Sequence, residues 1–136
     1  MRYLGLDLGS KTLGVALSDK SGIIASSLTI IRHDEDYSGL IKEVKDLIDE
    51  YKVDEIVLGL PKNMNNTIGP KGELSLQFKK MLEDKTKLKV HLVDERLSTV
   101  EATNVLLSND TSRRKRKKVI DSMAASIILQ RYLDRK

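Results

Sequence analysis

Acidic residues stand at three points of this sequence where apolar segments end or are interrupted. Asp7 interrupts the apolar start of the chain, Asp94 and Glu95 follow the short strand-like segment 90–93, and Asp121 lies in the last amphipathic segment. Carboxylates that gather without enough nearby cations repel one another, unless a bound metal ion compensates their charge. Carboxylate oxygen suits Mg²⁺ or Mn²⁺, and the chain contains no cysteine that could bind zinc.

Hydrophobic periodicity predicts the elements that position these carboxylates. Alternating or continuous apolar residues predict strands over 3–8, 15–17, 23–31, 56–60 and 90–93. Helical spacing predicts a helix over 40–51 with Ser38 as its N-cap, a second from Pro70, a third from Ser98 and a last one over 119–133. Because 136 residues fit one domain, we expect a single α/β domain, residues 1–136.

The order of these elements predicts which strand ends meet. Short turns join the first three strands, as in an antiparallel meander, whereas helices separate the later ones. Right-handed crossovers would then bring the carboxyl ends of the strands at 3–8, 56–60 and 90–93 to one edge of a sheet. Open α/β sheets bind their ligands at such an edge. We therefore expect a site there, with Asp7 and one acidic residue after position 93.

The last helix is expected to contribute a further carboxylate. Asp121 shares a helical face with Ala124, Ala125 and Ile128, and alanines allow a helix to approach a sheet closely. Asp121 would then point toward the strands.

Each acidic residue also has a simpler interpretation. Asp7 precedes a glycine-containing turn and could be a turn residue. Asp121 could cap a helix that starts at Ser122. Asp94 and Glu95 lie on opposite faces of a strand, so only one reaches the site, and we choose Glu95.

The net charge of +4 is concentrated in one place. Residues 113–118 form an unbroken run of six cations, and without it the remaining charge is +4 − 6 = −2. Such a run binds nucleic acid or an anionic membrane, or is simply solvated; no amphipathic helix with an aromatic face accompanies it, which disfavours the membrane. No segment is typical of a signal peptide or a membrane span, so we expect a soluble, intracellular protein. With 4% aromatic residues, recognition of the nucleic-acid backbone is favoured over base stacking.

Several segments together resemble one known family. Residues 3–19 resemble the opening motif of the YqgF/RuvX family, Holliday-junction resolvase-like proteins of the ribonuclease H-like superfamily. Residues 59–64, 69–70, 94–99 and 121–130 match its later motifs in the same order. Two departures are Thr12, where the family usually has arginine, and Asn65-Asn66, where Asp-Gly is common.

The resemblance implies a fold, a site and an activity. The fold would be a ribonuclease H-like five-stranded mixed sheet of order 3-2-1-4-5, with an antiparallel second strand and flanking helices. Asp7, Glu95 and Asp121 match the family's acidic positions, which would be catalytic and hold one or two Mg²⁺ (or Mn²⁺) ions. The activity would be that of a bacterial cytoplasmic nuclease acting on the 5′ end of the 16S rRNA precursor, on branched DNA, or on both.

The nucleic-acid partner would be held mainly through its phosphates. The residues expected to bind it are Lys11, Lys62, Asn63, Arg96, Arg113, Arg114, Lys115, Arg116, Lys117 and Lys118. A symmetric junction cutter would need two sites and hence a homodimer, so we expect a monomer or a homodimer. We expect His33 and His91, near and within strands, to have structural roles.

Two other classes of protein share parts of this pattern. An ATPase of the actin and sugar-kinase type also has an Asp-x-Gly hairpin, but it closes two lobes on its nucleotide, and this chain has room for one. A catalytically silent nucleic-acid-binding protein of the same fold remains the other alternative, although the presence of all three acidic residues disfavours it.

Overall fold

The computed structural model describes residues 1–61, 68–94 and 113–136, and within the last helix it gives side chains from Met123 onward. A five-stranded sheet forms the middle layer. Its strands lie in the spatial order β3 (Ala25–Arg32), β2 (Thr12–Ser18), β1 (Tyr3–Leu8), β4 (Glu55–Leu60) and β5 (Val90–Asp94). β2 is antiparallel to both of its neighbours, while β1, β4 and β5 run parallel. The expected order 3-2-1-4-5 with an antiparallel second strand is thereby confirmed.

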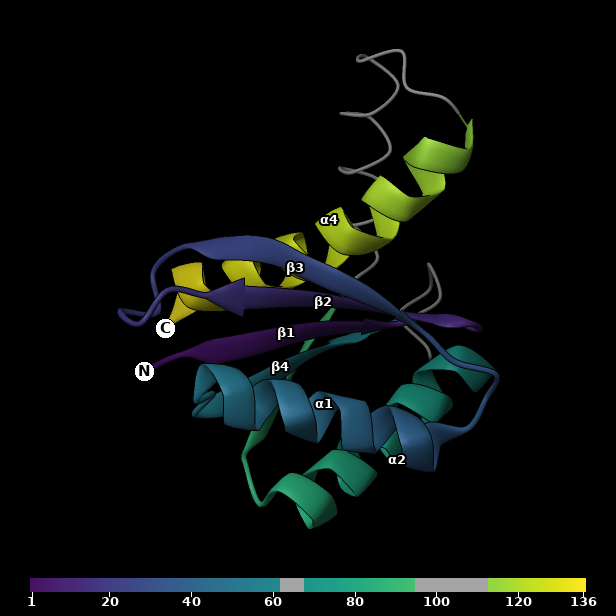
Figure 1. The fold of residues 1–136 in the computed structure, drawn as a ribbon, viewed down its shortest axis with the longest axis horizontal. Coiled ribbons are helices and arrows are strands. Elements are labelled where there is room, and N and C mark those ends of the chain that lie inside the picture. Colours follow the sequence, from purple (N-terminus) through teal and green to yellow (C-terminus); the bar gives the residue numbers. More distant parts are fainter. Residues whose placement is uncertain (62–67, 95–112) are drawn as a thin grey trace.

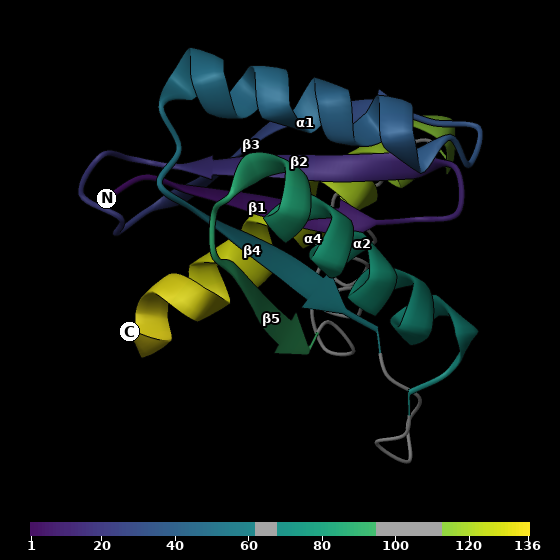
Figure 2. The same ribbon diagram turned by 90° about the horizontal axis from the view of Figure 1, so that it is seen from below.

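Helices cover both faces of the sheet (Figures 1 and 2). α1 (Tyr37–Tyr51) and α2 (Pro70–Thr86) lie on one face, and α4 (Arg113–Arg135) crosses the other. The core between the sheet and α1 and α2 includes Leu4, Leu6, Leu40, Val44 and Phe78. The core beneath α4 includes Tyr3, Val57, Val93, Ala125 and Leu129. None of the described helices is long and apolar enough to cross a bilayer.

The start of α1 differs from the prediction. Asp36 is the N-cap, and its Oδ1 accepts a hydrogen bond from the backbone N–H of Gly39 at 3.2 Å. The expected cap, Ser38, lies inside the first turn. The prediction was wrong because the helix was expected to begin close to its first buried apolar residue, Leu40, whereas it begins at Tyr37. Asp36 stands before the true start of the helix and provides the carboxylate oxygen.

The hairpin between β2 and β3 also corrects an expected boundary. The strand predicted from Ile23 begins at Ala25, because Asp19 Oδ1 accepts the backbone N–H groups of Ile23 and Ile24 at 2.8 and 3.1 Å. Those two amides are used in the turn and cannot join the sheet. The same two hydrogen bonds, that from Ile23 first, lower the pKa of Asp19 from its ordinary value. β2 is longer than predicted, Thr12–Ser18 instead of 15–17.

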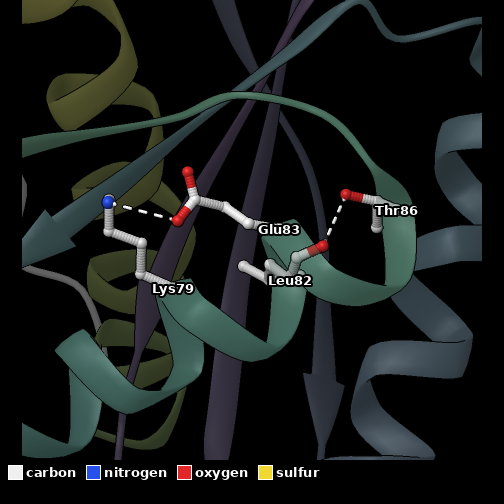
Figure 3. Close-up of polar contacts among 4 residues, drawn as sticks. All are labelled: Lys79, Leu82, Glu83 and Thr86. Atoms are coloured by element: carbon white, nitrogen blue, oxygen red, sulfur yellow. Dashed lines mark hydrogen bonds and ion pairs between the residues drawn. The ribbon is translucent and has the colours of Figure 1, made fainter.

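α2 begins at Pro70, as predicted, and most of its apolar residues pack in the core with the sheet and α1: Leu74, Phe78, Met81 and Leu82. Local polar contacts support its last turns (Figure 3). Lys79 Nζ lies 3.3 Å from Glu83 Oε1, one helical turn away. The hydroxyl of Thr86, the last residue of α2, donates a 2.6 Å hydrogen bond to the carbonyl of Leu82 one turn earlier, which adds a side-chain bond to the end of the helix.

α4 is longer than the predicted segment 119–133. It includes residues 113–118, so the six-residue basic run is helical and does not form a loop before the helix. Arginine and lysine are good helix formers, which explains why the helix extends through them. Asp121 is therefore an internal residue of α4, and its alternative role as an N-cap is wrong. The helix predicted from Ser98 lies outside the described residues.

Candidate active site

The carboxyl ends of β1, β4 and β5 meet at one edge of the sheet (Figure 2). Leu6 of β1 pairs with Leu58 of β4, and Leu60 of β4 pairs with Asp94 of β5. Asp7 follows Leu6 directly, so it lies near the same end of its strand as Asp94 does of β5. The predicted meeting of strand ends is confirmed for the described residues.

Asp7 lies on the face of β1 that α4 covers. Leu4, Leu6 and Leu8 belong to the core beneath α1 and α2, so the alternate residues of the strand face α4. Tyr3 is in contact with Tyr132 of α4, their ring centroids 5.6 Å apart. Asp7 itself is half-buried. An aspartate at this place is therefore oriented by its strand toward the last helix.

Gly5 allows α4 to pack against β1 at very short range. A Cβ atom at this position would lie 2.7 Å from Leu129 Cβ and 3.1 Å from the carbonyl oxygen of Ala125. Carbon atoms in ordinary contact are about 3.5–4.0 Å apart, so only glycine fits here. The predicted close approach of an alanine-containing helix is thus present, with glycine as the strand's contribution.

The line of contact between β1 and α4, from Tyr3 and Tyr132 to Gly5 and Ala125, is called the seam below. The order of contacts along it indicates which part of α4 is nearest to Asp7. Tyr3 meets Tyr132, and Gly5, two residues further along β1, meets Leu129 and Ala125. β1 and α4 therefore run in opposite directions. The next step along the strand is Asp7, and the preceding turn of the helix contains position 121, four residues before Ala125. The backbone brings these two positions to the same end of the seam.

Alternation along β5 determines on which face of the sheet each residue near its end lies. His91 stacks on Tyr132 of α4 and Val93 belongs to the core beneath α4, so this set of alternate residues faces α4. Val90 belongs to the opposite core, and Asp94 shares its face. Asp94 thus lies on the other side of the sheet from Asp7. Glu95, the next residue, is outside the described residues.

The expected nucleic-acid-binding residues fall into two groups. Lys11 is exposed in the turn between β1 and β2, four residues after Asp7. Arg113–Lys118 occupy the end of α4 that follows the direction of β1 beyond Asp7, and only their backbone is described. Lys62, Asn63 and Arg96 lie outside the described residues. Since 3.6 residues complete a turn, six consecutive helical residues surround the helix and do not form a one-sided stripe.

The structure describes the side chain of one of the three predicted metal ligands. Among the side chains that the structure describes, no three acidic or histidine residues are close enough together to hold a metal ion. Of the three predicted ligands, Asp7 is within that set, whereas Glu95 and the side chain of Asp121 are not. The donors predicted from the sequence are all carboxylates, which is the chemistry that Mg²⁺ prefers.

The two histidines have contacts that fit structural roles. His91 Nε2 lies 2.6 Å from Glu55 Oε1, and the imidazole stacks on Tyr132 with ring centroids 4.6 Å apart. This cluster joins β4, β5 and α4 toward the starts of the two strands, away from Asp7. Burial, and after it the neighbouring Tyr3 and Glu55, raise the pKa of Tyr132, so its hydroxyl stays neutral. His33 lies instead beside the turn that follows Asp7. The only feature of the sequence that pointed to this residue was its position near the end of a predicted strand.

Comparisons with known proteins agree with this architecture. A family model described as "RuvX: Holliday junction resolvase" matches residues 1–135. A protein of Geobacillus sp. (strain WCH70) named "Putative pre-16S rRNA nuclease" is 55% identical over 137 residues, which cover 100% of this chain and 99% of that protein. A protein of Bacillus subtilis (strain 168) with the same name is 54% identical, covering 98% of each chain.

Solved structures show the same fold at low sequence identity. Thermus thermophilus RuvC in complex with a Holliday junction substrate matches with a TM-score of 0.63 at 13% identity, over 99% of this chain and 94% of that one. The Holliday junction resolvase of fowlpox virus matches with a TM-score of 0.58 at 18% identity, over all of both chains.

Proposed function

This chain belongs to the RuvX family, and we propose that it is a metal-dependent nuclease, a single catalytic domain over residues 1–136, that processes the 5′ end of the 16S rRNA precursor. The observation that carries the proposal is the seam between β1 and α4. Asp7 faces the helix at the carboxyl end of β1, and Gly5 lets the helix pack closely enough for position 121 to lie near it. The names of relatives more than half identical over the full chain support the substrate.

The acidic residues of the site fit a magnesium ion. Asp7, Glu95 and Asp121 would hold it, and Mg²⁺ bound there would neutralise the phosphate and lower the pKa of an attacking water. Glu95 is favoured over Asp94, because Asp94 lies on the face of β5 opposite to that of Asp7, and alternation returns the next residue to the α4 face. β1 holds the backbone of Asp7 within the sheet, which limits the orientations that its carboxylate can take.

The cations place the substrate. Lys11 is exposed in the turn after β1, and the basic residues 113–118 extend α4 beyond the same edge of the sheet. Cations beyond Asp7 at this edge would bind phosphates next to the cut bond. This arrangement recognises the backbone and shape of structured nucleic acid more than its base sequence.

The decisive experiment compares wild type and Asp7→Asn on two substrates, a structured RNA with the 16S precursor 5′ end and a four-way DNA junction. We expect cleavage in Mg²⁺ or Mn²⁺, none in EDTA, and loss of cleavage in Asp7→Asn while binding is retained. Asp19→Asn, an exposed turn carboxylate at the other end of the sheet, is the matched control and should cleave normally. Equal cleavage by wild type and Asp7→Asn would show that the site is elsewhere.

The same assays on wild-type protein also distinguish the proposed nuclease from the other candidate functions. Binding without cleavage of either substrate would favour the silent nucleic-acid-binding protein, and cleavage of the junction alone would favour branched DNA as the substrate. ATP hydrolysis without nuclease activity would favour the ATPase. If the basic residues hold phosphates, the logarithm of the affinity should fall with the logarithm of salt by about 0.7–0.9 per phosphate contact.

A further inference from the structure

The turn between β1 and β2 is held by one residue from outside it. The turn, residues 9–11, begins two residues after Asp7, and the N–H of Gly9 closes it on the carbonyl of Thr12 at 2.8 Å. The backbone N–H of His33 donates to the carbonyl of Lys11 at 2.9 Å, and His33 Nε2 lies 3.0 Å from the carbonyl of Gly9. His33 therefore binds two carbonyls of the turn at once.

The hydrogen bonds of the imidazole determine its tautomer. The N–H of Glu35 lies 3.2 Å from His33 Nδ1, so Nδ1 must accept and carries no proton. The proton of the neutral ring is then on Nε2, where it is donated to the carbonyl of Gly9. Each ring nitrogen thus has a defined partner, one on the turn and one on the segment that leads into α1.

The imidazole is buried and packed as well as bonded. His33 is 7% exposed, and its ring centroid lies 5.4 Å from that of Tyr37 in α1. Tyr37 in turn meets Phe78 of α2 edge to face at 6.3 Å. Burial, and after it the charge of Glu35, raise the pKa of the Tyr37 hydroxyl, which keeps that ring neutral. His33 therefore connects the turn to the helical layer and has little freedom to move.

We propose that His33 is a positioning residue, which fixes the turn after Asp7 so that its exposed Ser10 and Lys11 meet a phosphate of the substrate in one orientation. The inference rests on the proposed nuclease function, since the phosphate belongs to the nucleic acid bound at that edge. A preformed turn lowers the cost of ordering the chain when substrate binds.

Two substitutions of His33 each remove one of the two hydrogen bonds of its imidazole and keep the other. Asparagine at position 33 offers an acceptor near the place of Nδ1 but no donor near Nε2, whereas glutamine can reach with an N–H near the place of Nε2. His33→Asn therefore keeps the bond to Glu35 and loses the one to Gly9, and His33→Gln does the reverse. KM and kcat are measured on the precursor RNA. We expect His33→Asn to raise KM about fivefold, as the loss of one neutral hydrogen bond produces, with kcat within about twofold, and His33→Gln to restore KM.

A double-mutant cycle with Lys11→Ala tests whether His33 acts through the turn. If it does, the factor by which His33→Asn raises KM should be smaller in the Lys11→Ala background than in wild type, because one of the two contacts that it orients is already gone and only that of Ser10 remains. Independent, multiplying effects of the two substitutions would overturn the proposal. So would a KM for His33→Gln as high as that for His33→Asn, since both variants disturb packing but only one loses the bond to Gly9.

Amide hydrogen exchange tests the inference without relying on nuclease activity. We expect the Gly9 amide to exchange at least about fivefold faster in His33→Asn than in wild type and His33→Gln, with the amides of α1 unchanged. Unchanged exchange at Gly9 in His33→Asn would overturn the positioning role even in an active enzyme. Failure of wild type to cleave any substrate, with the exchange result as expected, would instead refute the proposed function and leave the support of the turn by His33 established.

Discussion

Replacing Gly5 by alanine tests the seam on which the candidate site depends. The new Cβ would lie 2.7 Å from Leu129 Cβ and 3.1 Å from the backbone carbonyl of Ala125. Neither atom belongs to the flexible end of a side chain, so the conflict is relieved only if α4 moves away from β1. Carbon–carbon contacts of about 3.5–4.0 Å require a displacement of roughly 1 Å.

The expected loss of stability follows from two opposing contributions. Overpacking in a core costs about 1–3 kcal/mol, whereas replacing glycine by alanine stabilises by about 0.4–1 kcal/mol through the unfolded chain. The net decrease in the free energy of unfolding should be about 1–2 kcal/mol. For a domain of this length that corresponds to a Tm about 3–8 °C lower.

Activity should decrease more than stability explains. At a temperature where Gly5→Ala is fully folded, a shift of about 1 Å between Asp7 and α4 should lower metal-dependent cleavage roughly 10- to 100-fold. Urea denaturation and initial cleavage rates measure the two effects, with Ser26→Ala at an exposed position of β3 as the control, expected within about 0.5 kcal/mol of wild type. Wild-type stability of Gly5→Ala would refute the steric reasoning, and wild-type cleavage by the folded variant would refute the role of the seam in the site.

Two further predictions concern the hairpin between β2 and β3. Gln130 of α4 accepts the N–H of Ala25 and donates to the carbonyl of Ile23, each at 2.8 Å, so Gln130→Leu should lower the free energy of unfolding by about 1–2 kcal/mol in urea titrations. Gln130→Glu would place a carboxylate oxygen against the Ile23 carbonyl and against Asp134, whose Oδ1 lies 3.0 Å from the Gln130 amide nitrogen, so it should not restore stability at neutral pH; equal stability of wild type and Gln130→Leu would contradict this. Because the folded-state pKa of Asp19 is lowered, its charge stabilises the fold above the ordinary value of 3.8, and this contribution disappears as the pH falls through the folded-state pKa. The denaturation midpoint of wild type should therefore exceed that of Asp19→Asn at pH 7, and the difference should shrink as the pH falls below 3.8; a difference independent of pH would exclude the charge as its cause.

Apolar patterns that extend over several positions predicted the fold well. The alternation at 3–8 and the apolar runs at 56–60 and 90–93 each became a strand of the parallel set, because burial on both faces leaves few other structures for such runs. Boundaries set by single polar residues were predicted less well. Asp36 replaced Ser38 as the cap of α1, and Asp19 removed Ile23 and Ile24 from β3. Side-chain hydrogen bonds decide these ends, and periodicity does not encode them.

The candidate site was predicted unevenly for a related reason. The place of Asp7 followed from strand alternation, which also separates Asp94 from it. The basic residues 113–118 were expected before the last helix and belong to it, since a run of like charges resembles a solvated loop in composition while each residue favours helix. The role of His33 depends on a contact with Gly9, 24 residues earlier in the chain, and no local pattern marks such a contact.

The position of α4 has a consequence for the order in which the protein becomes functional during synthesis. All five strands and both helices of the opposite face leave the ribosome before α4, which, among the described elements, is the one that covers Tyr3, Val57 and Val93. Until α4 docks, the growing chain carries an uncovered apolar sheet face and lacks position 121 beside Asp7. The helix that closes the second core is therefore also the one that brings position 121 toward β1, so packing of that core and assembly of the candidate site are one event.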